Sequence, residues 1–249
     1  MGRDLRSDLR RAWRLSDTGD GLIYRDAHYF TATVEVDPKQ MKQWLPPGIK
    51  PAGPPRADLF TAHFPDCNYG SVYEEAGLFV HIKTVRGTGI HCPWIIVNDD
   101  VALILGREML GYPKKWADIE WSLDGDHIHA TAGRKGTRLI SMSGTLGEVI
   151  TASAPPIIGR PHRNAVSLLG GFGSIRAFTP KERPIEVRRV EDFQLTVTGS
   201  ERDPIDQMGL GRVIEARLHR VDLPTSRVLF PVRPLSPLFA ASRLRPRVL

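Results

Sequence analysis

The sequence predicts a mainly β fold: an antiparallel, closed or partly closed β-barrel with flanking strands and a few short helices. Three observations lead to this class. Short segments with alternating apolar residues recur along the chain, 20 prolines and 23 glycines interrupt any long helical period, and Asp124-Gly125 is a strong signal for a hairpin turn. The regular alternation of strands and helices that builds a parallel sheet is missing. Closure of a sheet removes its exposed edges and encloses a small cavity.

The expected elements follow one another as short strands with one early and one late helix. The first strand covers 27–36, because apolar residues alternate along one of its faces. A short helix comes next, with Asp37 as N-cap and Pro38 in its first turn. A terminal helix is expected over 237–244. Further strands are expected at 57–64, 77–86, 94–98, 101–105, 117–123, 127–132, 137–143, 185–198 and 213–221.

We expect one domain over 21–249 after an N-terminal arm over 1–20, because no linker, internal repeat or low-complexity tract divides the chain. In the arm, Leu5, Leu9 and Trp13 recur at helical spacing among charged residues. This pattern is typical of an amphipathic helix that docks on the body of the protein or on a partner subunit.

The charge and the apolar content of the chain indicate where the protein resides and which classes of partner it binds. The arm is too charged for a secretory signal, and no apolar run approaches the length of a membrane span. The net charge is +6 and the pI is about 9.5, but the arginines are dispersed and no basic run carries interleaved aromatic residues. We therefore expect a cytoplasmic protein without a membrane or nucleic-acid partner, whose positive field attracts small anions.

No cofactor or metal is expected from the sequence. Cys67 and Cys92 are the only cysteines, too few for a disulfide framework. His127 and His129 share a face of an expected strand, but a third ligand is absent from the local sequence. The glycine-rich stretch 170–174 lacks a P-loop lysine and a complete dinucleotide fingerprint, so a turn is its simpler interpretation.

The adjacent lysines Lys114 and Lys115 are the most informative pair in the chain. They follow a Gly-Tyr-Pro turn and the apolar run 101–105, which places an amine beside the expected core. A lysine amine can attack a carbonyl group only when it is uncharged, and burial or a neighbouring cation favours that form. A pair of solvated surface charges is the alternative interpretation.

The stretch that contains these lysines resembles the active-site signature of the acetoacetate decarboxylase family. The resemblance rests on Gly-Arg-Glu at 106–108 and Tyr-Pro-Lys-Lys at 112–115. Weaker similarity occurs at 28–30, 45–48 and 71–77, and the match is loose towards the C-terminus. The resemblance implies a cone-like barrel, usually in a homo-oligomer, that acts on a small keto acid and needs no organic cofactor or metal.

The resemblance also implies catalytic roles. Lys114 would form the Schiff base, and Lys115 would help to keep its amine uncharged or simply belong to the turn. Glu75 would move protons at the enamine carbon, with an exposed carboxylate at a turn as the alternative. Because neighbouring residues of an extended segment point to opposite faces, only one of Glu74 and Glu75 is expected to face inward.

The substrate positions depart from the family pattern. Tyr73 and Tyr112 are expected to line the substrate site. The family arginine falls on Ala27, and a second family glutamate falls near 59–61, where no carboxylate is present. Arg25 lies two residues before Ala27 and is a candidate replacement, although a solvent-facing arginine is the simpler interpretation.

Three functions remain open at this stage. The first is decarboxylation of a small keto acid through a lysine imine and enamine. The second is an aldolase-dehydratase reaction that condenses a pyruvate-like acid with an aldehyde. The third is a barrel that binds a small ligand without chemistry.

Overall fold

The structure is a computed structural model that describes residues 22–167, 173–226 and 231–235. The expected N-terminal arm and the helix expected over 237–244 lie outside these residues, as does most of the glycine-rich stretch. Within them, the mainly β prediction is confirmed, because the strands join in one 15-stranded sheet. Its pairings are antiparallel except for two short parallel ones.

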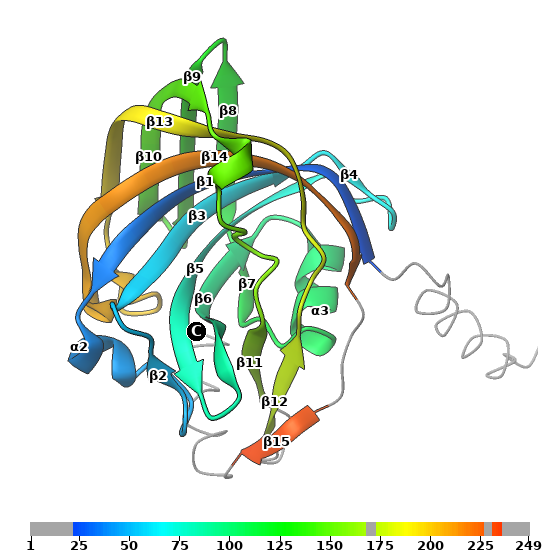
Figure 1. The fold of residues 1–249 in the computed structure, drawn as a ribbon, viewed down its shortest axis with the longest axis vertical. Coiled ribbons are helices and arrows are strands. Elements are labelled where there is room, and N and C mark those ends of the chain that lie inside the picture. Colours follow the sequence, from blue (N-terminus) through cyan, green and yellow to red (C-terminus); the bar gives the residue numbers. More distant parts are fainter. Residues whose placement is uncertain (1–21, 168–172, 227–230, 236–249) are drawn as a thin grey trace, which may run out of the picture.

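The strands of the sheet range from 2 to 17 residues in length. The strands are β1 Leu22–Val36, β2 Lys50–Pro51, β3 Arg56–Phe64, β4 Asp66–Cys67, β5 Tyr73–Thr84, β6 Gly87–Val97, β7 Lys114–Trp116, β8 Asp118–Asp124, β9 His127–Arg134, β10 Thr137–Val149, β11 His162–Ser167, β12 Gly173–Phe178, β13 Arg183–Val197, β14 Leu210–Ser226 and β15 Pro231–Leu235. The helices are α2 Pro38–Lys42 and α3 Asp100–Glu108, with 3₁₀ turns at Thr151–Ser153 and Ile205–Met208. In Figure 1, β1, β3 and β14 arch across the molecule, and α3 lies near β7.

The sheet is open in the described residues, so full closure, one of the two forms of the expected closed or partly closed barrel, is not confirmed. The pairing order runs β15-β12-β11-β6-β5-β3-β1-β14-β13-β10-β9-β8, and the end strands β15 and β8 do not pair with each other. The reason lies in the apolar face of β9, where Ile128, Ala130 and Ala132 pack against the body of the sheet. Face-to-face packing therefore buries this end of the sheet instead of edge-to-edge closure.

The segment expected as a strand at 101–105 is instead the middle of α3. Asp99 caps this helix, because its side chain accepts a hydrogen bond from the backbone N–H of Ala102 at 2.6 Å. A short apolar run does not by itself distinguish a strand from a buried helix. The other early helix is confirmed at Pro38–Lys42 with Asp37 as N-cap. No helix in the described ranges is long and apolar enough to cross a membrane.

Both faces of the central strands are buried, each in its own apolar cluster. Phe30, Leu59 and Leu78 belong to one cluster, and Tyr29 and Ala62 belong to the other. Successive side chains of a strand point to opposite faces, so the same strands supply both clusters. The face that carries Tyr29 and Ala62 is called the cavity face below, and the other is called the opposite face.

Candidate active site

Strand register aligns the first two site residues on the cavity face. Tyr29 of β1 lies opposite Ala62 of β3, and Ala62 lies opposite Glu75 of β5. Residues that are directly opposite on neighbouring strands point to the same side of the sheet. The small Ala62 therefore leaves space between the side chains of Tyr29 and Glu75.

Lys114 reaches the same place from β7. This short strand pairs in parallel with β6, where Lys114 lies opposite Ile95. The Lys114 side chain is only 6% exposed, and its Nζ donates a hydrogen bond to Oε2 of Glu75 at 2.7 Å. Nζ also lies 5.4 Å from the centroid of the Tyr73 ring, within the range of a cation–π contact. Lys114, Glu75 and Tyr73 thus form one buried group.

The side chain of Lys114 packs along helix α3 at Gly106. A Cβ atom at Gly106 would lie 2.6 Å from Cδ and 2.7 Å from Cε of Lys114, so any larger residue would collide with the lysine stem. The guanidinium of Arg107 donates to the backbone carbonyl of Lys114 at 3.4 Å. The Gly-Arg part of the signature therefore positions the lysine.

Lys114 and Glu75 border a small cavity. The lining residues are Tyr24, Tyr29, Phe64, Tyr73, Glu75, Ala102, Gly106, Leu110, Tyr112, Lys114, Ile158, Phe178, Pro180 and Leu223. Lys114 and Glu75 are the only charged side chains among them. The cavity volume of about 30 Å³ is room for roughly two water molecules, so a larger ligand must displace side chains to enter.

The aromatic wall contains a hydrogen-bonded tyrosine. The hydroxyl of Tyr112 lies 3.1 Å from Nδ1 of His162, and Nε2 of His162 lies 2.9 Å from the carbonyl of Ile158. Because a carbonyl only accepts, Nε2 carries the proton and Nδ1 accepts from Tyr112. Burial lowers the pKa of His162 to about 3, so this imidazole is neutral near pH 7.

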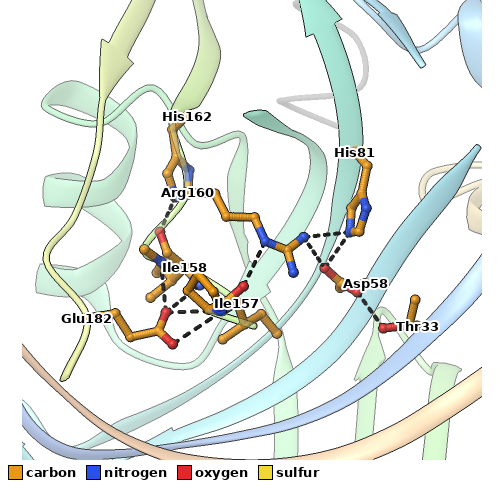
Figure 2. Close-up of polar contacts among 10 residues, drawn as sticks. Thr33, Asp58, His81, Ile157, Ile158, Arg160, His162 and Glu182 are labelled. Carbon is orange, nitrogen blue, oxygen red and sulfur yellow. Dashed lines mark hydrogen bonds and ion pairs between the residues drawn. The ribbon is translucent and has the colours of Figure 1, made fainter. Parts of the chain in front are cut away.

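One wall of the cavity is a short segment that polar contacts hold in place (Figure 2). The Glu182 carboxylate accepts hydrogen bonds from the three backbone N–H groups of 157–159, and the middle residue of that segment faces the cavity. The following residue, Arg160, donates to Asp58 at 3.0 Å, which also contacts His81 at 2.7 Å. Burial raises the pKa of Glu182, although the N–H groups work against it. No motif in the sequence signals this support.

Lys115 points to the opposite face, away from the cavity. Its Nζ forms an ion pair with Asp203 and donates to the carbonyl of Arg202 at 3.3 Å. Asp203 also accepts from Arg134 at 3.0 Å and from Nε1 of Trp94 at 3.0 Å. Burial lowers the pKa of Lys115, and the bond to Asp203 opposes that effect. The structure therefore does not bring Lys115 to Lys114.

Arg25 also lies away from the cavity. Its side chain is 56% exposed and pairs with Asp66 at 2.9 Å. The strand is irregular between Tyr24 and Ala27, where Asp26 has a φ of 50°. This irregularity breaks the simple alternation, so Tyr24 rather than Arg25 lines the cavity. Of the expected site residues, the structure thus gathers Lys114, Glu75, Tyr73 and Tyr112.

Glu74 illustrates the same separation of faces. Its carboxylate contacts His63 at 2.8 Å and accepts from Asn98 at 2.5 Å, on the side of β5 away from Lys114. Glu74 and Glu75 thus point to opposite faces of β5, as predicted. In the ranges that the structure describes, no group of three or more His, Cys, Asp or Glu residues could hold a metal ion.

Comparison with known proteins assigns the chain to a family. The family model described as "Acetoacetate decarboxylase (ADC)" matches residues 12–232. No match is found among curated proteins. Three solved structures share the fold at low identity. A structure from a study of acetoacetate decarboxylase has a TM-score of 0.76 at 15% identity and covers 85% of this chain and 90% of its own.

The acetoacetate decarboxylase of Legionella pneumophila has a TM-score of 0.72 at 15% identity, covering 85% of this chain and 88% of its own. The enduracididine biosynthesis enzyme MppR, complexed with pyruvate, has a TM-score of 0.71 at 16% identity, covering 84% and 90%. The structural likenesses establish the fold, and the family model spans most of the sequence. The chain belongs to the acetoacetate decarboxylase family.

Proposed function

We propose that the protein is a carbon–carbon lyase that forms a Schiff base between Lys114 and a small keto acid. The observation that carries this proposal is the 2.7 Å contact between Lys114 Nζ and Glu75 Oε2 at the edge of a cavity, with both side chains 6% exposed. One proton transfer across this contact would leave a neutral amine beside a neutral carboxylic acid. A neutral amine is the form that attacks a carbonyl carbon.

The proposed steps use Lys114, Glu75, the substrate and water. Lys114 transfers a proton to Glu75, and its nitrogen then bonds to the keto carbon. Glu75 returns the proton to the carbinolamine hydroxyl, which leaves as water and gives the protonated imine. When a carboxylate is β to the imine, the electron pair of its carbon–carbon bond moves towards nitrogen and carbon dioxide leaves. Glu75 takes a proton from water and delivers it to the enamine carbon, and a second water adds to the resulting imine and releases the ketone and Lys114.

Aldol condensation with dehydration is the second candidate. In this reaction the enamine carbon attacks an aldehyde, and the adduct loses water. No arginine is among the cavity-lining residues that the structure describes, which weakens the case for acetoacetate as substrate. In addition, a solved MppR structure holds the condensation product of pyruvate and imidazole 4-carboxaldehyde, at a TM-score of 0.68 and 16% identity. Ligand binding without chemistry is the remaining alternative.

Imine trapping tests the proposal. Wild-type protein treated with borohydride and either acetoacetate or pyruvate should gain one reduced adduct, located on Lys114 by peptide mapping. Lys114→Arg should gain none, whereas Lys115→Arg should still be labelled. An unlabelled wild-type protein that binds keto acids would instead indicate ligand binding alone. Carbon dioxide release from acetoacetate, compared with product formation from pyruvate and an aldehyde, separates the two reactions.

A further inference from the structure

Tyr29 carries a buried hydroxyl group without a hydrogen-bond partner among the described residues. The residue is 0% exposed, and its Oη has no partner within the described ranges. Burial raises the pKa of this phenol, so it keeps its proton and remains a donor. Native proteins usually satisfy such groups, and an exception calls for an explanation.

The unpartnered hydroxyl belongs to the cavity that Lys114 and Glu75 share. Tyr29 is one of the lining residues, and the lateral row Tyr29, Ala62 and Glu75 crosses three adjacent strands. Neighbouring strands are about 4.8 Å apart, so the backbones of Tyr29 and Glu75 lie roughly 10 Å apart. Because Ala62 is small, its side chain leaves space on the cavity face. The phenol of Tyr29 borders this space on one side, and Lys114 and Glu75 border it on the other.

The other tyrosine hydroxyls among the described lining residues have partners. The hydroxyl of Tyr112 is bonded to His162, and those of Tyr24 and Tyr73 interact with Tyr69 and with each other. No arginine is among the described lining residues. A substrate oxygen other than that of the carbonyl group whose carbon Lys114 attacks therefore meets Tyr29 as the available donor.

We propose that Tyr29 is the residue that recognises the second oxygen group of the substrate, through one hydrogen bond to a carboxylate oxygen. This inference rests on the proposed function and deepens it. A phenol donates a single bond, whereas an arginine fork binds both carboxylate oxygens. The site therefore selects a small 2- or 3-keto acid over a simple ketone by one charge-assisted bond.

The variant Tyr29→Phe tests this role, with pyruvate and acetone as matched probes. Both form the same kind of imine, but only pyruvate carries the carboxylate. The concentration for half-maximal borohydride trapping should rise about tenfold for pyruvate and stay unchanged for acetone. Equal trapping of pyruvate by variant and wild type, or an equal loss for both probes, would overturn the inference. Thr61→Val, which removes another fully buried hydroxyl without a partner among the described residues but away from the cavity lining, is the control and should match wild type.

Thermal stability gives an independent test of the same variant. Removal of a hydroxyl that has no protein partner leaves no other group unpaired, so the Tm of Tyr29→Phe should equal or exceed that of wild type. A lower Tm would indicate a structural role and contradict the proposal.

A failure of the Schiff-base function can be told apart from a failure of this inference. If neither probe labels wild-type protein, the proposed function fails, and calorimetric binding of pyruvate then decides the role of Tyr29. Weaker pyruvate binding by Tyr29→Phe than by wild type still supports recognition by the phenol. Equal binding, or no binding by wild type, overturns it.

Discussion

Lys114 and Lys115 are adjacent in the chain and almost equally buried, at 5% and 4% exposure, yet they lie in different environments. On the opposite face, Lys115 pairs with Asp203, which also receives hydrogen bonds from Arg134 and Trp94. On the cavity face, Lys114 pairs with Glu75 and borders the small cavity. Several polar partners hold the Lys115 ammonium in one arrangement. Lys114 has a single charged partner beside a cavity, so it can pass its proton to that partner and bond to another molecule.

The neighbouring carboxylates divide in the same way. Glu74 is engaged by His63 and Asn98 on one side of β5, and Glu75 is engaged by Lys114 on the other. The hydrogen bond from His63 lowers the pKa of Glu74. Residue type alone therefore does not identify the reactive lysine or carboxylate. The reactive residues are those with few polar partners and a cavity beside them.

The largest expected effect separates the two carboxylates. Glu75→Gln removes the group that accepts the Lys114 proton and should lower turnover by about 10²–10⁴-fold. Glu74→Gln should leave turnover within about threefold of wild type, because its side chain lies on the other face. Steady-state assays of carbon dioxide release or aldol product formation provide the measurement. Similar losses in both variants would show that the two faces are not functionally distinct.

The second prediction concerns stability on the opposite face. Lys115→Met removes one partner from the buried Asp203 and should lower the free energy of unfolding by about 3 kcal/mol, measured by urea denaturation. Labelling of Lys114 by borohydride should persist in the folded variant. Lys114→Met should cost less stability, because Glu75 borders the cavity, where a water or a proton can compensate it. A folded Lys115→Met protein that is no longer labelled would break the proposed division of roles.

Much of this arrangement can be predicted from local sequence. The alternation in β1, the Asp37 cap and the Asp124-Gly125 turn are local signals, and each one marks an element that the structure contains. The split between Glu74 and Glu75 follows from strand geometry alone. These predictions succeed because a few neighbouring residues determine the outcome.

The failures depend on contacts between distant parts of the chain. The bulge at Asp26 places Arg25 outside the cavity, and no composition signal marks a left-handed aspartate. The partner of Lys115 is Asp203, 88 residues further along the chain as the numbering shows. Similarly, Glu182 supports the cavity wall through backbone N–H groups, which carry no sequence signature. The strand expected over 101–105 is also wrong, because a short apolar run does not by itself distinguish a strand from a buried helix such as α3.

The third prediction sharpens the account of how Lys114 reaches the cavity. Gly106→Ala places a methyl group where Cδ and Cε of Lys114 now lie, since the added carbon would be 2.6 and 2.7 Å away. The lysine must then shift, and imine formation should slow by about tenfold. Rates of borohydride labelling give the measurement. Gly136→Ala is a comparison for stability alone, because its Cβ would meet nothing within 4 Å although its φ is +80°; it should destabilise the protein without slowing the labelling of folded molecules.

The smallest expected effect is a difference in acid sensitivity between the two faces. On the cavity face, burial holds the pKa of His162 at about 3, below its ordinary value of 6.5. Between these values the unfolded chain binds a proton that the folded protein does not, so the contribution of His162 to stability is complete above about pH 6.5 and is lost as the pH falls towards 3. On the opposite face, burial tends to raise the pKa of Asp203, but the bonds from Lys115, Trp94 and Arg134 bring it below 3.8.

The contribution of Asp203 to the free energy of unfolding is therefore present above about pH 4 and is lost only at lower pH. Between about pH 7 and pH 5, His162→Gln should lose roughly 1–2 kcal/mol less unfolding free energy than wild type, whereas Asp203→Asn should lose as much as wild type over that interval. Urea denaturation at several pH values measures both, and the exposed His127→Gln should follow wild type. If His162→Gln loses as much unfolding free energy as wild type over this interval, His162 is not a neutral, buried imidazole that supports Tyr112. A histidine that is already charged in the folded protein would produce no difference between the variant and wild type.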